Sequence, residues 1–131
     1  MKVLRRLNNV DIEAEGDNSR DIFGDLAKLQ EVFQHSKCGC CDGTEYRYVV
    51  RKAKDAKGKE FDYYELHCQD PKCRARIPFG QSENGVLYPK RRWGQLSEKD
   101  QEQRQDAKPA PDAKFDYLPN NGWYKYTGPK S

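Results

Sequence analysis

The sequence predicts an α+β fold, in which a strand–helix unit precedes a small antiparallel sheet, and a mobile linker and an aromatic C-terminal segment follow it. Three observations predict this organisation. In residues 1–36 apolar residues recur first with the period of a strand and then with that of a helix. Two later runs rich in Tyr and Val flank a polar turn that contains glycine. Five cysteines form two clusters beside those runs.

Residues 1–36 form the predicted strand–helix element. Apolar and acidic residues alternate in Val10–Glu15, the pattern of a half-buried strand, and Val3–Leu7 can pair with this strand across Asn8-Asn9. Ser19 is a candidate N-cap for a helix from about residue 20 to 34. We expect the apolar stripe of that helix to pack on the strands, with a second copy of the chain as the alternative. The stripe consists of Ile22, Leu26, Leu29 and Phe33.

Residues 37–94 form the predicted sheet domain. Glu45–Arg51 and Glu60–Cys68 have strand composition, and the polar residues between them end near a glycine, so the two runs predict a hairpin. Arg76–Phe79 supplies a third strand, and Gly85–Tyr88 a fourth after the Asn84-Gly85 turn. Pairing of the first two strands brings both cysteine clusters to the same end of the sheet.

The cysteine spacing predicts a zinc site with four thiolate ligands. A pair of cysteines a few residues apart on a tight turn presents two thiolates to one ion, and two such turns complete a tetrahedron. A site filled by four protein ligands has no open position, so the zinc is expected to be structural rather than catalytic. The expected ligands are Cys38, Cys41, Cys68 and Cys73.

Other uses of these residues are open from the sequence. Disulfides would need an oxidising compartment, but no apolar signal stretch follows Met1 and the cysteine count is odd. Both facts favour the reducing cytoplasm. Cys40 is the spare thiol and an alternative ligand for either Cys38 or Cys41. His35 and His67 stand beside the clusters, where we expect ordinary polar residues rather than ligands.

The two cysteine pairs and the strands that extend from them resemble the zinc-ribbon family over about residues 37–80. Many zinc-ribbon knuckles have glycine after the second cysteine, where this chain has Asp42 and Arg74, and the second pair is longer than usual. The resemblance implies binding of DNA or RNA, or a place in transcription or replication machinery. The chain as a whole is also similar to small bacteriophage proteins encoded among replication and recombination genes.

The remaining third of the chain divides into residues 95–114 and 115–131. The first segment is polar, ends in a Pro-Ala-Pro sequence and is expected to be a mobile linker. The second concentrates large rings around an Asn-Gly turn signal. We expect these rings to dock on the protein's own body, or else on a partner.

The basic charge lies in residues 36–94, which carry thirteen Lys and Arg against eight Asp and Glu. Proteins that bind single strands combine cations along the phosphate backbone with rings on which bases stack. We therefore expect a zinc protein that binds nucleic acid, foremost single-stranded DNA in replication or recombination. The candidate contacts are Tyr46, Arg47, Tyr48, Arg51, Lys52, Tyr63, Tyr64, Lys90, Arg91, Arg92 and Trp93.

Two alternatives accompany this interpretation. Because side chains alternate across a strand, the face with Tyr46 and Tyr48 and the face with Arg47 and Arg51 cannot both be exposed, so some tyrosines must pack in the core. The chain could also be a zinc-scaffolded module that binds a replication, transcription or defence protein through its aromatic segment. No catalytic constellation, phosphate loop or membrane-length apolar run is visible, so we expect neither an enzyme nor a membrane protein.

Overall fold

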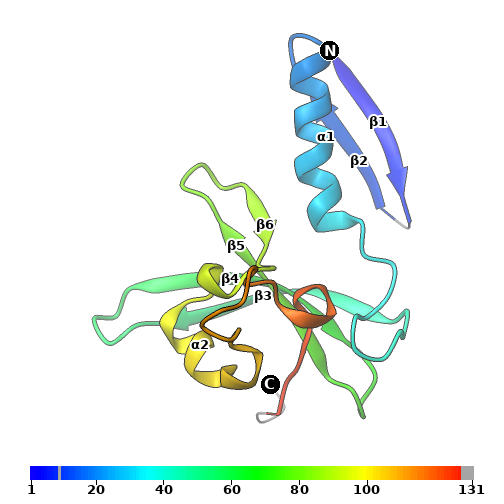
Figure 1. Cartoon of the computed structure of the whole chain (residues 1–131). Helices are drawn as coiled ribbons and strands as arrows, with labels where there is room; N and C mark the ends of the chain where they lie inside the picture. The colour runs from blue at the N-terminus through cyan, green and yellow to red at the C-terminus, as the bar shows by residue number, and fades with distance from the viewer. Residues whose placement is uncertain (9, 128–131) are drawn as a thin grey trace. The chain divides into compact units, whose positions relative to one another are not determined.

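The structure is a computed structural model that describes residues 1–8 and 10–127. Its secondary structure confirms the α+β class, with two antiparallel sheets and one main helix (Figure 1). The chain divides into two compact units. One contains Met1–Ser36 with Gln81–Tyr88, and the other contains Lys37–Gly80 with Pro89–Ser131. None of the helices in the described ranges has the length and apolar character needed to cross a membrane.

The first unit contains the predicted hairpin and helix. Strands β1 (Lys2–Leu7) and β2 (Val10–Glu15) pair antiparallel, and helix α1 (Ser19–Phe33) runs along them (Figure 1). Asn8 has a φ of 54° at the turn, and its side chain donates to the Gln34 carbonyl at 2.9 Å, which joins the turn to the end of the helix. The second turn residue, Asn9, is outside the described residues. The small core of this unit includes Ile12, Ala14, Ile22 and Val32.

Two details of the helix differ from the sequence prediction. The N-cap is Asn18 rather than Ser19, because the Asn18 side chain accepts a hydrogen bond from the Asp21 amide at 3.0 Å. The buried residue near the C-terminus is Val32, whereas Phe33 is half-buried. Each difference is a shift of one residue along the chain. Ile22 is buried as predicted, and the helix itself is as expected.

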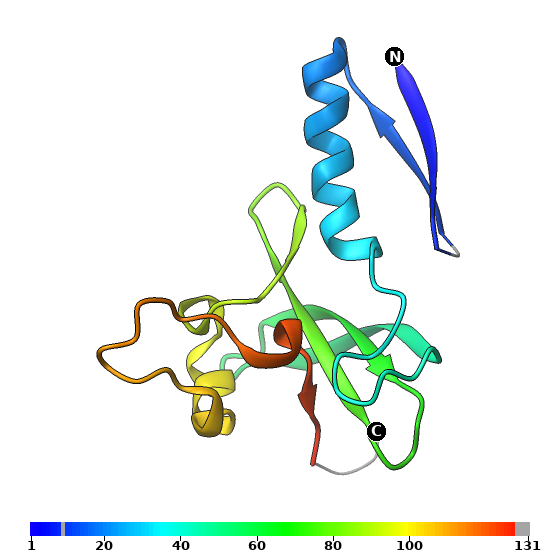
Figure 2. The same ribbon diagram turned by 45° about the vertical axis from the view of Figure 1, so that its right-hand side comes forward.

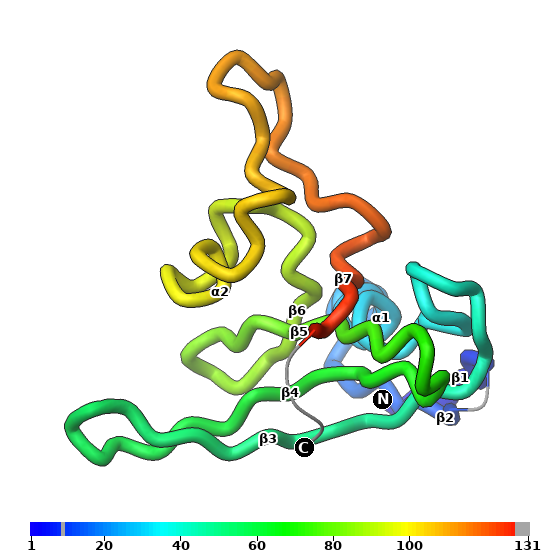
Figure 3. Tube along the Cα trace, turned by 90° about the horizontal axis from the view of Figure 1, so that it is seen from below, coloured from blue at the N-terminus to red at the C-terminus, as the bar shows by residue number. Residues whose placement is uncertain are grey.

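The second sheet is built on a long hairpin of β3 (Tyr46–Lys54) and β4 (Glu60–Cys68) (Figure 3). Tyr46 lies opposite Cys68, and Lys54 lies opposite Glu60. The connecting turn is held by Asp55, whose carboxylate accepts hydrogen bonds from two backbone amides, and by Gly58 at a φ of +81°. The hairpin predicted from the sequence is therefore confirmed, with β3 ending three residues later than expected.

Strand β5 (Ala75–Gln81) is the centre of this sheet. It pairs with β4 on one side, and β6 (Leu87–Pro89) and the short β7 (Tyr124–Lys125) also pair with it. The predicted third and fourth strands are thus present. The unpredicted member is β7, which brings the C-terminal segment against β5 (Figure 3).

The segment predicted as a linker contains short helices in the structure. A 3-10 turn η1 (Trp93–Gln95), helix α2 (Glu98–Gln103) and a second 3-10 turn η2 (Gln105–Ala107) follow one another. Ser97 caps α2 by accepting a hydrogen bond from the Asp100 amide. Leu96 and Arg104 are buried, and the Arg104 guanidinium lies 4.3 Å from the centre of the Tyr124 ring. These two side chains attach a largely polar segment to the second unit.

The C-terminal segment docks on its own unit, as expected. The turn η3 (Pro119–Gly122) leads the C-terminal segment back to the sheet (Figure 2). The Trp123 side chain is only 1% exposed, and its ring centre lies 6.4 Å from that of Tyr46. A Cβ atom at Gly39 would approach the Trp123 ring to 2.7 Å, so the indole packs directly against the backbone between two cysteines. Trp123 therefore links the C-terminal segment to the first cysteine cluster.

We expect Trp123→Ala to be strongly destabilising, because it removes the largest fully buried side chain of the described residues. The loss of packing should lower the free energy of unfolding by about 3–5 kcal/mol. Urea unfolding of the metal-loaded protein measures this change. Phe115→Ala is the control, because Phe115 is exposed in the same segment and its loss should change stability by no more than about 0.5 kcal/mol. Equal stabilities for the two variants would contradict the docking of the segment.

Candidate metal centre and the basic face of the sheet

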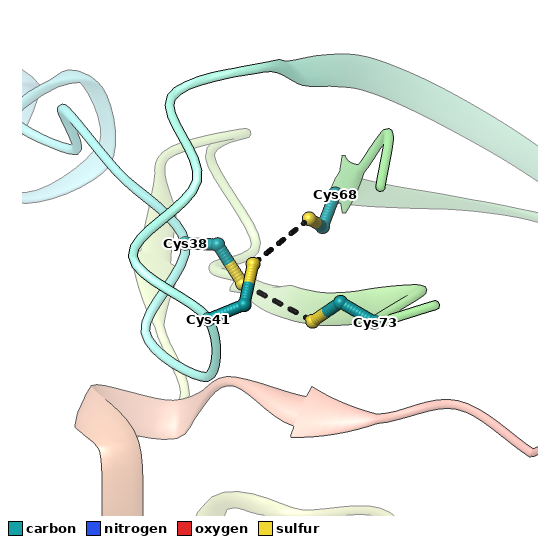
Figure 4. Close-up of side chains that lie close together, drawn as sticks. All are labelled: Cys38, Cys41, Cys68 and Cys73. Atoms are coloured by element: carbon teal, nitrogen blue, oxygen red, sulfur yellow. Dashed lines mark hydrogen bonds between the residues drawn. The ribbon is translucent and has the colours of Figure 1, made fainter. Parts of the chain in front are cut away.

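The structure brings Cys38, Cys41, Cys68 and Cys73 together (Figure 4). The first two come from the loop before β3, and the other two from the end of β4 and the loop before β5. The Sγ atoms of Cys38 and Cys73 are 3.8 Å apart, and those of Cys41 and Cys68 are 3.6 Å apart. All four sulfur atoms lie within 4.8 Å of one another. This set, here named the cysteine tetrad, is the one that the spacing predicts.

The geometry of the tetrad fits a tetrahedral metal ion. With metal–sulfur bonds of about 2.3 Å, a tetrahedron separates its sulfur atoms by about 3.8 Å. Backbone amides of Cys40 and Gly43 point at the sulfurs of Cys38 and Cys41, each at 3.4 Å, as donors that stabilise thiolates. The tetrad is therefore compatible with a bound metal ion.

The electrostatics of the tetrad favour binding of a cation. Burial raises the pKa of the Cys68 thiol to about 11, and burial also raises the pKa of Cys73. The hydrogen bond from the Gly43 amide lowers the pKa of the more exposed Cys41. Thiolates packed this closely repel one another, and a divalent cation at their centre removes that cost.

The two knuckles that carry the cysteines have the same backbone turn. The Asp42 amide donates to the Cys38 carbonyl at 3.1 Å, and the Arg74 amide donates to the Asp70 carbonyl at 3.0 Å. Asp42 and Arg74 adopt φ values of 60° and 53°, the left-handed conformation that favours glycine. The departures from the zinc-ribbon glycine pattern therefore leave the turn intact, at the cost of two strained residues.

The neighbours of the tetrad have other roles. The Cys40 sulfur lies 3.8 Å from the Asn120 side-chain nitrogen, and burial raises the pKa of this thiol. Nε2 of His67 is 2.8 Å from a carboxylate oxygen of Glu65. Neither Cys40, His67 nor His35 belongs to the metal-compatible cluster found among the described residues.

One face of the second sheet gathers the arginines and several rings. Because side chains alternate, the strand register places Arg47 beside His67 and Arg51 beside Tyr63, with Arg76 next to His67 on β5. We name this surface the basic face. It consists of Arg47, Val49, Arg51 and Ala53 on β3, Phe61, Tyr63, Glu65 and His67 on β4, Arg76 and Pro78 on β5, and Tyr124 and Tyr126 at the C-terminal end.

The basic face is hollowed by two cavities. The first, of about 240 Å³, lies by the second knuckle and includes Arg47, His67 and Arg76 in its lining. The second, of about 440 Å³, extends toward the β3–β4 turn and includes Arg51, Phe61 and Tyr63. Arg76 and Tyr126 line both, so the two cavities are neighbours on this face, one at the knuckle and the other in the far half of the hairpin.

A buried carboxylate organises the centre of this face. Glu65 accepts hydrogen bonds from Arg51 at 3.2 Å and from His67 at 2.8 Å. Burial alone would raise the pKa of Glu65, but the hydrogen bonds from His67 and Arg51 outweigh it, so the pKa lies below its ordinary value. Glu65 is therefore ionised at neutral pH and holds Arg51 and His67 in place.

The structure separates the other predicted contact residues from the basic face. Tyr46, Tyr48, Lys52 and Tyr64 are on the opposite face of the hairpin, where Tyr46 packs against Trp123. The Lys90–Trp93 run has contacts within its own unit: the ammonium of Lys90 is 3.7 Å from the Asp100 carboxylate, and Arg92 lies over the Tyr117 ring at 5.1 Å. Of the predicted residues, Arg47, Arg51 and Tyr63 are brought together.

Sequence reasoning missed three residues of the basic face and its rim: Arg74, Arg76 and Tyr126. Alternation along the third predicted strand was a usable signal for Arg76, because it puts this residue on the side of His67. No local signal identifies Tyr126, because its position depends on the pairing of β7 with β5, in which Lys125 lies opposite Ala75, 50 residues earlier in the chain.

The chain was compared with protein families, curated proteins and solved structures. No protein-family model, curated protein or solved structure matches the chain.

We expect the purified chain to contain about one metal ion, zinc by the ligand set, and Cys68→Ser to lose it. Three thiolates leave the tetrahedron incomplete, and the hydroxyl is a poor substitute for the buried sulfur. Elemental analysis and the absorption spectrum of the Co²⁺-substituted protein measure both expectations. The matched control is Cys40→Ser, which removes a thiol outside the tetrad and should retain the metal. Loss of the metal from the control but not from Cys68→Ser would show that the ligand set is wrong.

Proposed function

We propose that this protein binds single-stranded nucleic acid, foremost single-stranded DNA, across the basic face of its second sheet. The observation that carries the proposal is the pair of neighbouring cavities on this face, which arginines and aromatic rings line together. Flat or convex surfaces rich in charge are common on soluble proteins, whereas a concave strip that combines cations with rings is suited to a polymer of phosphates and bases.

The cations of the basic face are arranged to follow a phosphate backbone. Arg47 is exposed at the knuckle end, and Arg51 is four residues further along the same strand. Their Cα atoms are about 13 Å apart at the usual rise of a strand, a span of about two nucleotides. Exposed lysines at and around the β3–β4 turn continue the positive charge beyond Arg51: Lys54, Lys57 and Lys59.

The rings on this face are partly exposed and therefore accessible to bases. Phe61 is 37% exposed, and the centres of the Phe61 and Tyr63 rings are 6.4 Å apart. The Arg51 guanidinium covers Tyr63 at 4.6 Å, a contact that a base could share or displace. Bases in a duplex are stacked on one another and have no free faces, so rings of this kind select single strands.

Zinc is the metal that best suits the tetrad, and we assign it a structural role. Four cysteine sulfurs at tetrahedral spacing are the usual ligand set of structural zinc, and they leave no position for water or substrate. The metal therefore holds the knuckle end of the basic face in shape. Resemblance to zinc ribbons and to small bacteriophage proteins adds a proposed setting in replication or recombination.

A second candidate function is binding of a protein partner. The observation that favours it is the pair Phe115 and Tyr117, whose ring centres are 5.7 Å apart while their side chains are 66% and 57% exposed. Two large rings at the surface of the C-terminal segment suit a hydrophobic contact with another protein of the same process. Trp123, which is buried, takes no part in such a contact.

We expect Arg47→Ala to weaken binding of all single-stranded sequences alike and to reduce the slope of log affinity against log salt concentration by about 0.7. Tyr63→Ala should weaken binding by about 1–3 kcal/mol with little change in that slope, because it removes a stacking ring rather than a cation. Fluorescence anisotropy of labelled single-stranded DNA, single-stranded RNA and duplex DNA across a salt series measures these effects.

The hairpin supplies matched controls on its opposite face. Lys52→Ala removes one charge and Tyr48→Ala removes one exposed ring, both outside the basic face. We expect smaller effects from these variants than from their counterparts. If the combined charge reversal Arg47→Glu and Arg51→Glu leaves affinity unchanged in a folded, metal-loaded protein, the basic face does not bind nucleic acid. Binding through Phe115 and Tyr117 would then be the function to test.

A further inference from the structure

The knuckle end of the basic face contains a small cavity with an excess of positive charge. Its volume is about 240 Å³, below the range of about 300–1,000 Å³ typical of sites for whole organic ligands. Three guanidinium groups and one carboxylate line it beside the Cys68 sulfur, and these four charged groups have a formal surplus of two positive charges. The lining residues are Arg47, Val49, His67, Cys68, Gln69, Asp70, Pro71, Arg74, Arg76 and Tyr126.

The wall formed by the second knuckle is held rigidly. The Asp70 carboxylate accepts a hydrogen bond from the Lys72 amide at 2.9 Å, and its backbone carbonyl accepts from the Arg74 amide at 3.0 Å. The Gln69 side chain donates to the His67 carbonyl at 3.0 Å. Cys68 belongs both to this wall and to the tetrad, so a metal ion held by the tetrad would brace the cavity directly.

Arg74 is the residue that distinguishes this knuckle. It has a φ of 53°, a conformation that costs an arginine energy and that glycine adopts freely. Its guanidinium lies 5.4 Å from the centre of the Tyr126 ring, and that of Arg76 lies 3.5 Å from the same ring. Tyr126 thus gathers two arginines at one side of the cavity. The strained position supplies a charge that glycine would not.

We propose that this cavity binds a terminal phosphate of a nucleic-acid strand. A phosphate monoester carries a charge of about −1.5 to −2 at neutral pH, which matches the surplus of two positive charges, whereas an internal diester carries only −1. Planar guanidinium groups donate paired hydrogen bonds to phosphate oxygens, and three of them surround the cavity. The assignment rests on the proposed function for the source of the phosphate, and it adds recognition of a strand end.

The position of the cavity agrees with an end rather than the middle of a strand. The neighbouring cavity lies in the far half of the hairpin, and this one lies at the knuckle end, where Gln69, Asp70 and Pro71 form a wall. A strand that occupies both cavities therefore meets the knuckle at one end.

The experiment compares three single-stranded oligonucleotides of one sequence: 5′-phosphorylated, 3′-phosphorylated and unphosphorylated. With the metal-loaded full chain we expect at least one phosphorylated form to bind about tenfold more tightly than the unphosphorylated form, the gain expected of charge-assisted hydrogen bonds. Arg74→Gly should abolish this ratio. Because glycine suits the backbone at residue 74, we expect this variant to fold and to retain its metal.

Asp42→Gly is the matched control, because it makes the same backbone change at the same position of the first knuckle, outside the cavity. We expect it to keep the tenfold ratio. Lys52→Gln controls for the loss of one positive charge on the opposite face and should also keep it.

The outcomes separate the inference from the proposed function. Equal binding of all three oligonucleotides overturns the end-recognition inference and leaves single-strand binding standing. If none of the three binds, both proposals fall. Inorganic phosphate is titrated in parallel by calorimetry: if it binds in an Arg74-dependent way while the oligonucleotides bind equally, the cavity takes the free ion and the assignment to a strand end is wrong. A ratio that survives Arg74→Gly also overturns the inference.

Discussion

The cysteine tetrad is the constraint on which the second unit depends. Its four sulfurs come from the loop before β3, the end of β4 and the loop before β5, so one metal ion would fix three segments of the sheet at one end. Few side chains among the described residues are fully buried and could hold these segments together by packing alone, and charged residues make up 34% of the chain. In a domain with so little apolar core, metal binding supplies much of the free energy of folding.

The two knuckles show how this constraint is built into the backbone. Both turn through a residue with positive φ, and neither residue is glycine. A carboxylate oxygen of Asp42 is 3.3 Å from the ammonium of Lys37, and both side chains are exposed, so this surface ion pair contributes little stability. At Arg74 the side chain reaches the Tyr126 ring beside a cavity. The same backbone geometry therefore serves a purely structural purpose at one knuckle and positions a cation at the other.

Alternation along β3 and β4 divides the remaining chemistry between two faces. Leu66 and Tyr46 are on the side that packs with Trp123 and contains the core, whereas Arg47 and Arg51 are on the hollowed side. The buried Glu65 belongs to the hollowed side, where its carboxylate accepts hydrogen bonds from Arg51 and His67. The C-terminal segment contributes to both faces: Trp123 closes the core, and Tyr124 and Tyr126 extend the basic face.

The sequence by itself determined the local features: the β1–β2 hairpin, helix α1, the β3–β4 hairpin and the four cysteines of the tetrad. Each depends on spacing or on turn residues within a short stretch, as with Asp55 and Gly58 at the β3–β4 turn. Only the tertiary structure decided which face of the hairpin is buried, and that Lys90 and Arg92 are engaged within their own unit. It also decided that Arg74, Arg76 and Tyr126 meet at one cavity. The physical reason is that burial and long-range pairing depend on contacts between distant segments, such as β7 with β5, which no local pattern encodes.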